Sequence, residues 1–368
     1  MKQLFKKKKK LSASSLLLAG LFLCIVLSVG CSVVKNTSGK NTTRKNAESE
    51  NTIEQNSIEK GNSNKISIVC TTFPQYDWVK NILGEEAERF YVTLLLDNGV
   101  DMHSYQPAVK DIATAGSSDL FIYVGGESDT WVEDALKEAK NKDLKAINLM
   151  ETLDNFVKEE EVVEGMQDDE HGHSHTASED SHGEHEETDE IEYDEHIWLS
   201  VKNAEILVQK LTDVIKELDT DNAEEYQSNA DAYIKQLSDL DKEYESVISA
   251  ARLKTVVFGD RFPFRYLVDD YNLDYYAAFA GCSAETEASF KTVTFLAGKV
   301  DETGTKAILT IDGSDEKLAM TIKDNTKDKN QEILQMDSMQ SVKISESEDY
   351  NYINVMLKNL TVLKQALS

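Results

Sequence analysis

Short apolar runs alternate with stretches of helical periodicity along most of this chain, and this alternation limits the possible folds most strongly. In the first half we predict strands at residues 65–70, 90–95, 120–124 and 146–149, with helices at residues 75–84, 107–115 and 130–140 between them. Strands that alternate with helices form mostly parallel sheets covered by helices, and ligands bind beyond the carboxyl ends of such strands. The sequence therefore predicts an α/β fold.

The same alternation returns in the second half, after a long helical segment. Following a predicted helix at residues 201–218, the pair Asp221-Asn222 precedes a helical pattern that runs from residue 223 to about residue 251. A helix of roughly 28 residues spans about 42 Å, which suits a rigid rod between two lobes. Beyond it we predict strands at residues 255–258, 275–279, 307–310 and 331–336, and helices at residues 264–271, 290–300, 317–326 and 352–366.

These patterns predict the division of the chain into domains. The 368 residues, of which 40% are hydrophobic, are enough for two packed lobes. We expect an N-terminal lobe at residues 64–221, a linking helix at residues 222–251 and a C-terminal lobe at residues 252–368. The net charge of -28 argues against nucleic acid and against anionic membrane surfaces as partners.

One segment of the first lobe is too polar to fold on its own. Between residues 159 and 195 there are 17 Asp or Glu residues, five His and no Lys or Arg. Such a segment cannot bury enough apolar surface to offset its ordering entropy, so we interpret residues 159–193 as a solvated loop. Imidazoles among carboxylates are ligands for zinc, whereas a loop that serves solubility alone would need no histidines. The predicted auxiliary metal-capturing residues are His171, His173, His175, His182 and His185.

The N-terminus is organised as an export signal. Lysines at position 2 and at positions 6–10 precede an apolar run at residues 16–29, which ends at Gly30-Cys31. This arrangement resembles the processing site of bacterial lipoproteins, although Ser28 stands where that pattern prefers leucine. It implies a signal peptide at residues 1–30, lipid on Cys31 and a polar tether at residues 31–63. An ordinary secretory signal or an uncleaved anchor would also place the chain outside the cytoplasm.

Cys24 leaves with the signal and Cys31 carries lipid in this interpretation, so two cysteines remain. Cys70 and Cys282 either form a disulfide in an oxidising compartment or are separate buried thiols, and we favour the thiols.

Two histidines lie outside the acidic segment, and both follow predicted structural elements or precede them. His103 comes after the second strand, and His196 lies where the chain returns to apolar sequence. Asp260 and Asp337 follow strands of the second half, where each could also cap a helix. These four residues are the candidate metal ligands.

Three short segments around these residues carry a resemblance to a known family. The segment DMHSYQP around His103, the segment DEHIWL around His196 and the segment MDS around Asp337 are similar to ligand motifs of the lipoproteins that supply bacterial zinc and manganese ABC transporters. The resemblance implies two lobes that hold the ion between them, a monomer anchored by lipid at the outer face of the membrane, and a permease with its ATPase as partner. A histidine-rich loop before the second motif is typical of the zinc branch.

The resemblance fails at one ligand. The family has a His or Glu after the first strand of the second lobe, and here Gly259 stands at that position. Asp260 is the nearest replacement, although Arg261 beside it could pair with it. Glu285 and Glu287 are the other carboxylate candidates, and Cys282 is a soft-ligand outsider. A site of two His and two carboxylates is less specific for Zn²⁺, so Mn²⁺ stays an alternative.

Two other functional classes are alternatives to a transport protein. A secreted zinc hydrolase would need an open coordination position and a general base, and the sequence has no His-Glu-x-x-His motif, so we expect no enzyme. A surface adhesin or passive metal buffer would also use a lipid anchor and a histidine-rich loop. A buffer does not need a defined site between lobes, so loss of binding on changing His103 or His196 alone would favour transport.

Overall fold

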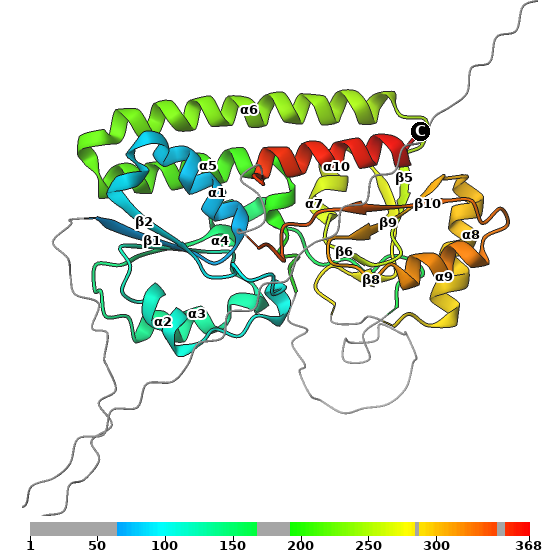
Figure 1. Ribbon diagram of the computed structural model, residues 1–368, viewed down its shortest axis with the longest axis horizontal. Coiled ribbons are helices and arrows are strands. Elements are labelled where there is room, and N and C mark those ends of the chain that lie inside the picture. The colour runs from blue at the N-terminus through cyan, green and yellow to red at the C-terminus, as the bar shows by residue number, and fades with distance from the viewer. Residues whose placement is uncertain (1–64, 168–191, 284–286, 344–349) are drawn as a thin grey trace, which may run out of the picture. The chain divides into compact units, whose positions relative to one another are not determined.

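The first half of the chain contains a four-stranded parallel sheet in the order β2-β1-β3-β4 (Figure 1). The computed structural model describes residues 65–167, 192–283, 287–343 and 350–368. The strands are β1 (Ile66–Cys70), β2 (Phe90–Leu94), β3 (Leu120–Tyr123) and β4 (Lys145–Asn148). In the register, Ile68 lies between Val92 of β2 and Leu120 of β3. Because all four strands are parallel, the segments that follow them meet at one edge of the sheet.

Five α-helices accompany this sheet. They are α1 (Phe73–Leu83), α2 (Val109–Ala115), α3 (Trp131–Lys137), α4 (Leu149–Leu153) and α5 (Val201–Leu218). Helix α1 begins where the Gln75 side chain accepts hydrogen bonds from the backbone amides of Thr71 and Thr72, at 3.0 and 3.2 Å. Helix α5 has the predicted bounds, whereas the short helix α4 was not predicted.

In the second half the strands are short and pair two by two. The pairs, all parallel, are β5 (Thr255–Val257) with β7 (Asp274–Tyr276), β6 (Arg261–Phe262) with β8 (Phe279–Ala280), and β9 (Ala307–Ile311) with β10 (Glu332–Met336). A parallel bridge between Phe258 and Leu309 connects the first and last of these pairs. The single strand predicted at residues 275–279 is in fact two, because its ends pair with different partners.

Four helices belong to this half: α7 (Arg265–Asp270), α8 (Phe290–Thr303), α9 (Lys317–Asn325) and α10 (Tyr352–Ala366). Together with the first half they confirm the predicted class, parallel sheets flanked by helices.

The predicted long helix is α6 (Ala223–Ala250), which packs on α1 and α5 of the first half and on α10 of the second (Figure 1). Its buried side chains recur every three to four residues: Tyr226, Ala230, Tyr233, Leu237, Leu240, Tyr244 and Ile248. That spacing gives one apolar stripe along the helix. The hydroxyl of Tyr244 donates to the carbonyl of Met356 in α10 at 2.6 Å, so the rod is fixed to the second half as well.

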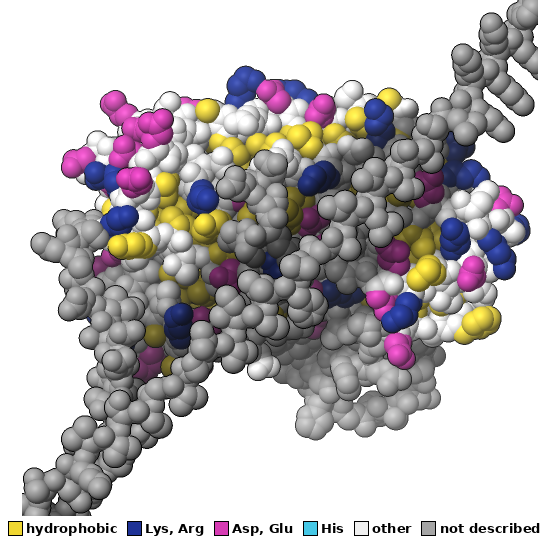
Figure 2. Space-filling model, in the orientation of Figure 1, with side chains coloured by type: hydrophobic (Ala, Val, Ile, Leu, Met, Phe, Trp, Pro, Cys, Tyr) yellow, Lys and Arg dark blue, Asp and Glu magenta, His cyan; other side chains and the backbone are white. Residues whose placement is uncertain are grey.

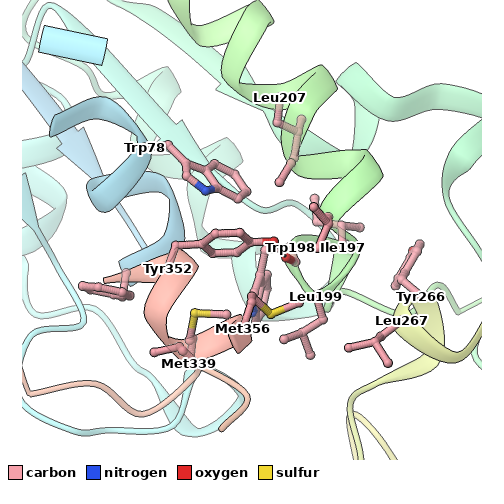
Figure 3. Close-up of a cluster of buried hydrophobic side chains, with 14 of the residues drawn as sticks. Trp78, Ile197, Trp198, Leu199, Leu207, Tyr266, Leu267, Met339, Tyr352 and Met356 are labelled. Atoms are coloured by element: carbon pink, nitrogen blue, oxygen red, sulfur yellow. Dashed lines mark hydrogen bonds between the residues drawn. The ribbon is translucent and has the colours of Figure 1, made fainter. Parts of the chain in front are cut away.

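A cluster of buried hydrophobic side chains, several of them aromatic, joins the two halves (Figure 3). The rings of Trp78 and Tyr352 meet edge to face at 5.4 Å, and the Tyr352 hydroxyl donates to the Trp198 carbonyl at 2.7 Å. The Trp198 indole in turn donates to the carbonyl of Ser338 at 2.8 Å. This core therefore holds the segments that carry His196 and Asp337 in fixed positions.

On the face shown in Figure 2, basic side chains lie among acidic ones over the described residues. No helix in the described part of the chain has the length and apolar character needed to cross a membrane. The described residues between 65 and 368 belong to one compact unit, and the predicted signal, the lipidation site Cys31 and the tether all precede them.

A buried carboxyl group between helices makes stability depend on pH. Asp77 of α1 accepts hydrogen bonds from the Tyr352 amide at 3.2 Å and the Tyr233 hydroxyl at 3.3 Å, and burial raises the pKa of its carboxyl to about 6. A raised pKa means that the folded state binds this proton more tightly than the unfolded state does. The contribution of Asp77 to the free energy of unfolding is therefore present near pH 4 and is lost as the pH rises through 6.

Replacing this group should remove that loss. Asp77→Asn keeps an acceptor oxygen and is expected to raise the free energy of unfolding at pH 8 by up to ~3 kcal/mol, with no gain at pH 4. Urea unfolding at the two pH values measures the difference. A gain of equal size at both would show that the charge of Asp77 is not responsible.

Candidate metal centre

His196 is fully buried at the turn Ile197–Leu199 before α5. Its Nδ1 atom lies 2.9 Å from Oδ1 of Asp194, and the same oxygen accepts from the His196 amide at 2.8 Å. Burial alone lowers the pKa of this imidazole, but the charge and hydrogen bond of Asp194 outweigh it and the pKa is raised. The carboxylate keeps a proton on Nδ1, so Nε2 is the atom left to bind either a second proton or a metal ion.

His103 lies in the short turn Met102–Ser104 after β2, where Asp101 accepts from its amide at 3.0 Å. Its Nδ1 atom is 3.1 Å from Oγ of Ser128, and that hydroxyl donates to Oε2 of Glu195 at 2.5 Å. Because Ser128 uses its only proton on the carboxylate, it accepts the proton of His103 Nδ1. Burial and the charge of His196 lower the pKa of His103 to about 3, so its Nε2 atom carries a free lone pair at neutral pH.

The two Nε2 atoms face each other at 3.1 Å. Two nitrogen ligands of one tetrahedral zinc ion are roughly 3.3 Å apart, as follows from Zn–N bonds of 2.0–2.1 Å. Among the residues that the structure describes, one group of three possible metal ligands has its ligand atoms within 4.8 Å of one another, namely His103, His196 and Cys282. The predicted histidine pair is thus brought together from segments that follow two different elements of the fold.

Cys282 follows β8, and its amide donates to Oε1 of Glu160 at 3.0 Å. Its thiol is free and half-buried, and the thiol of Cys70 is free and buried in the core, so the prediction of separate thiols is confirmed. Burial, together with the charges of Asp194 and Glu160, holds the pKa of the Cys282 thiol well above its usual value.

Asp260 and Arg261 lie beside this group rather than in it. Oδ1 of Asp260 accepts from the amide of Arg261 at 2.9 Å. The guanidinium of Arg261 pairs with Asp101 at 2.6 Å, so its partner is this aspartate of the first half and not Asp260. Asp260 lines a cavity of about 1240 Å³ with residues of both halves, including His103, Cys282 and Glu287.

Asp337 follows β10 and is engaged elsewhere. Its two carboxylate oxygens accept from the hydroxyl of Tyr350 at 3.0 and 2.9 Å, and Oδ1 also accepts from the Met339 amide at 2.8 Å. Burial and the charge of Asp312 raise the pKa of Asp337 to about 6. In this arrangement neither Asp337 nor Asp260 joins the described group of three ligands.

Of the remaining predicted residues, Glu287 is described and does not join the group. Glu287 lines the cavity, whereas Glu285 and the histidines of the acidic loop lie outside the described residues. A second, smaller cavity of about 210 Å³ is lined by His103, Cys282 and several acidic side chains that include Glu160 and Glu195.

Comparison with known proteins now identifies the family. A family model described as "Zinc-uptake complex component A periplasmic" matches residues 68–366. The chain belongs to this family. This match covers nearly all of the described chain and confirms the resemblance that the short motifs indicated.

Individual members of this zinc-uptake family are similar over most of the chain. The chain is 30% identical over 351 residues to the "Zinc-binding lipoprotein AdcA" of Streptococcus pneumoniae, with 95% of this chain and 60% of that protein covered. It is 28% identical over 304 residues to the "High-affinity zinc uptake system protein ZnuA" of Bacillus subtilis, with 83% and 88% covered. The chain thus spans less than two thirds of the length of the AdcA proteins, 56% for one of Streptococcus pyogenes.

Solved structures agree with this family. The Zn(II)-bound ZnuA-like domain of Streptococcus pneumoniae AdcA superposes with a TM-score of 0.61 at 27% identity, covering 82% of this chain and 99% of that one. The metal-dependent lipoprotein YcdH of Bacillus subtilis gives a TM-score of 0.63 at 26% identity, covering 82% and 99%.

Sequence reasoning missed most of the groups that orient the two histidines. Asp194 and Glu195 stand directly before His196 in the second family motif, and this adjacency was the available signal for them. Ser128, which links His103 to Glu195, and Gln340, whose Oε1 lies 3.0 Å from Nε2 of His196, come from distant segments with no recognisable motif.

Proposed function

We propose that this protein captures zinc outside the cytoplasm and delivers it to the permease of an ABC transporter, which works with its ATPase. The observation that supports this most is the pair of imidazoles whose Nε2 atoms face each other at 3.1 Å, each oriented through Nδ1 by a hydrogen bond, in a member of the zinc-uptake family. We assign the protein no catalytic activity.

The proposed ion is held between an N-terminal lobe at residues 64–221 and a C-terminal lobe at residues 252–368, which the helix at residues 222–251 connects. His103 and His196 supply the first two ligands. Asp337 and Asp260 remain proposed contributors from the second lobe, where Tyr350 donates to Asp337 and the Arg261 amide donates to Oδ1 of Asp260. Zinc fits the imidazole donors better than manganese does, since Mn²⁺ prefers carboxylate and water oxygens.

In this proposal the lipid on Cys31 keeps a monomer at the outer face of the membrane, and the histidines of the acidic loop collect zinc weakly before it reaches the cleft. Deleting residues 165–190 is expected to lower the number of zinc ions bound while leaving one tight site unchanged. Metal content by mass spectrometry after chelator competition measures this. Loss of the tight site on deletion would instead locate that site in the loop.

Uptake itself is tested in cells that lack their own copy of the gene. The unaltered chain is expected to restore zinc uptake at scarce zinc, and the variant His103→Ala is expected to fail while being exported in equal amount. Restoration by both would mean that the histidine pair does not serve transport.

The side chains that accept the Nδ1–H groups of the two histidines should affect zinc affinity almost as much as the histidines do. Asp194→Ala and Ser128→Ala each remove the acceptor of one Nδ1–H group, and each is expected to weaken zinc binding by about 10- to 100-fold. The matched control is Ser117→Ala, an exposed serine that hydrogen-bonds only within its own helix end. Chelator competition measures the affinities, and unchanged binding in both site variants would contradict the proposed roles.

A further inference from the structure

We infer that the thiolate of Cys282 is the third zinc ligand, so that the ion is bound by Nε2 of His103, Nε2 of His196 and Sγ of Cys282. The inference rests on the proposed function and adds the ligand that the family motif leaves unassigned. One ring nitrogen of each imidazole and Sγ of Cys282 lie within 4.8 Å of one another, and the two Nε2 atoms are 3.1 Å apart. In a tetrahedral site with Zn–N bonds of 2.0–2.1 Å and a Zn–S bond of about 2.3 Å, nitrogen and sulfur ligands are roughly 3.6 Å apart. The observed spacing exceeds this value by no more than about 1.2 Å.

The local fold holds Cys282 against the histidines. Strand β8, which lies shortly before Cys282 in the chain, pairs with β6, and the Cys282 amide donates a hydrogen bond to Glu160. The glycine between the strand and the cysteine permits this approach, since a Cβ atom on Gly281 would lie 2.9 Å from the Phe262 carbonyl and 3.1 Å from Cε1 of His196. Only a residue without a side chain lets the backbone run this close to the imidazole.

The position at which the family motif has its third ligand cannot supply one. A Cβ atom on Gly259 would lie 2.7 Å from Cα of Ala319 in α9, so the backbone of that helix occupies the space of any side chain. Two of the carboxylates nearby are engaged by other groups, Asp101 by Arg261 and Asp337 by Tyr350. Among the described His, Cys, Asp and Glu residues of the second half, Cys282 is the one that groups with the histidine pair.

A thiolate changes what the site selects. On binding, the Cys282 thiol releases its proton to solvent and the sulfur lone pair forms the bond to zinc, so one proton is released per ion from this residue. Thiolate sulfur is a soft ligand that favours zinc and other soft ions, whereas manganese prefers oxygen. Cys282 should therefore determine selectivity against manganese as well as contribute affinity.

The test uses cobalt(II) as a spectroscopic probe of the full chain. A thiolate bound to cobalt gives a charge-transfer band in the near ultraviolet, which imidazoles and carboxylates do not produce. We expect this band in the unaltered chain and in the control Cys70→Ala, and its loss in Cys282→Ser. We also expect zinc affinity to fall at least about 10-fold in Cys282→Ser, with a smaller preference for zinc over manganese.

A second measurement needs no substitution. Zinc is expected to protect Cys282 of the unaltered chain from alkylation, as read by mass spectrometry of its peptide, and a chelator should restore the reaction. Tight zinc binding without the cobalt band and without protection would overturn the role of Cys282 and leave the proposed function standing. Absence of tight zinc binding in the unaltered chain would overturn the proposed function itself.

Discussion

Replacing His196 by alanine is expected to abolish the stabilisation of the folded protein by zinc. An ion present at 1,000 times its dissociation constant raises the free energy of unfolding by about 4 kcal/mol, because it binds only the folded state. The Nε2 atom of His196 faces that of His103 at 3.1 Å, so its removal takes away half of the imidazole pair. We expect the zinc affinity to fall by more than roughly 100-fold, which is the loss expected on removing a group that hydrogen-bonds a ligand.

The comparison is made within each variant, with zinc and with a chelator, in urea unfolding. His196 is fully buried and bonded to Asp194, so His196→Ala also lowers the stability of the metal-free protein, and this loss is read from the chelator arm alone. His103→Ala, at a less buried position, should abolish the zinc effect with a smaller loss in the metal-free state. Full zinc stabilisation in either variant would exclude that histidine from the site.

Placing a histidine at position 259 is expected to destabilise the fold without improving zinc binding. The substitution Gly259→His restores the residue type that the family motif has there, but its Cβ atom would lie 2.7 Å from Cα of Ala319 and 2.9 Å from the Cβ atom of the same residue. Overpacking of this kind costs about 1–3 kcal/mol, and more where the obstacle is backbone.

Gly298→Ala is the matched control, since nothing lies within 4 Å of a Cβ atom at that helical position. It should be neutral or slightly stabilising because alanine favours the helix. Urea unfolding of the metal-free variants measures both changes. If Gly259→His folded with unaltered stability and bound zinc more tightly, position 259 would be open to the cleft after all.

The sequence was most informative where its patterns are long. Helices α5 and α10 have the predicted bounds and α6 differs from its prediction by one residue, because many turns contribute to one apolar stripe. Strands β6 and β8 are two residues each and carry no period of their own, so the prediction merged or omitted them. Their pairing depends on contacts between segments that are distant in sequence.

The site follows the same rule. His103 and His196 could be predicted because each lies in a motif at the end of an element. The position of Cys282 beside the two histidines could not be predicted. It depends on the pairing of β6 with β8, on the absence of a side chain at Gly281 and on the hydrogen bond to Glu160. Asp337 likewise accepts from Tyr350, which lies beyond the strand end that suggested this aspartate as a ligand.

The most direct measurement is the zinc content of the purified full chain after competition with a chelator of known affinity, together with that of the double variant His103→Ala/His196→Ala. We predict that one zinc ion per unaltered chain stays bound during the competition and that none stays bound in the double variant. Zinc on the histidines of the acidic loop should be removed by the chelator in both proteins. Equal retention by the two proteins, or no retained zinc in either, would contradict a zinc site built on His103 and His196.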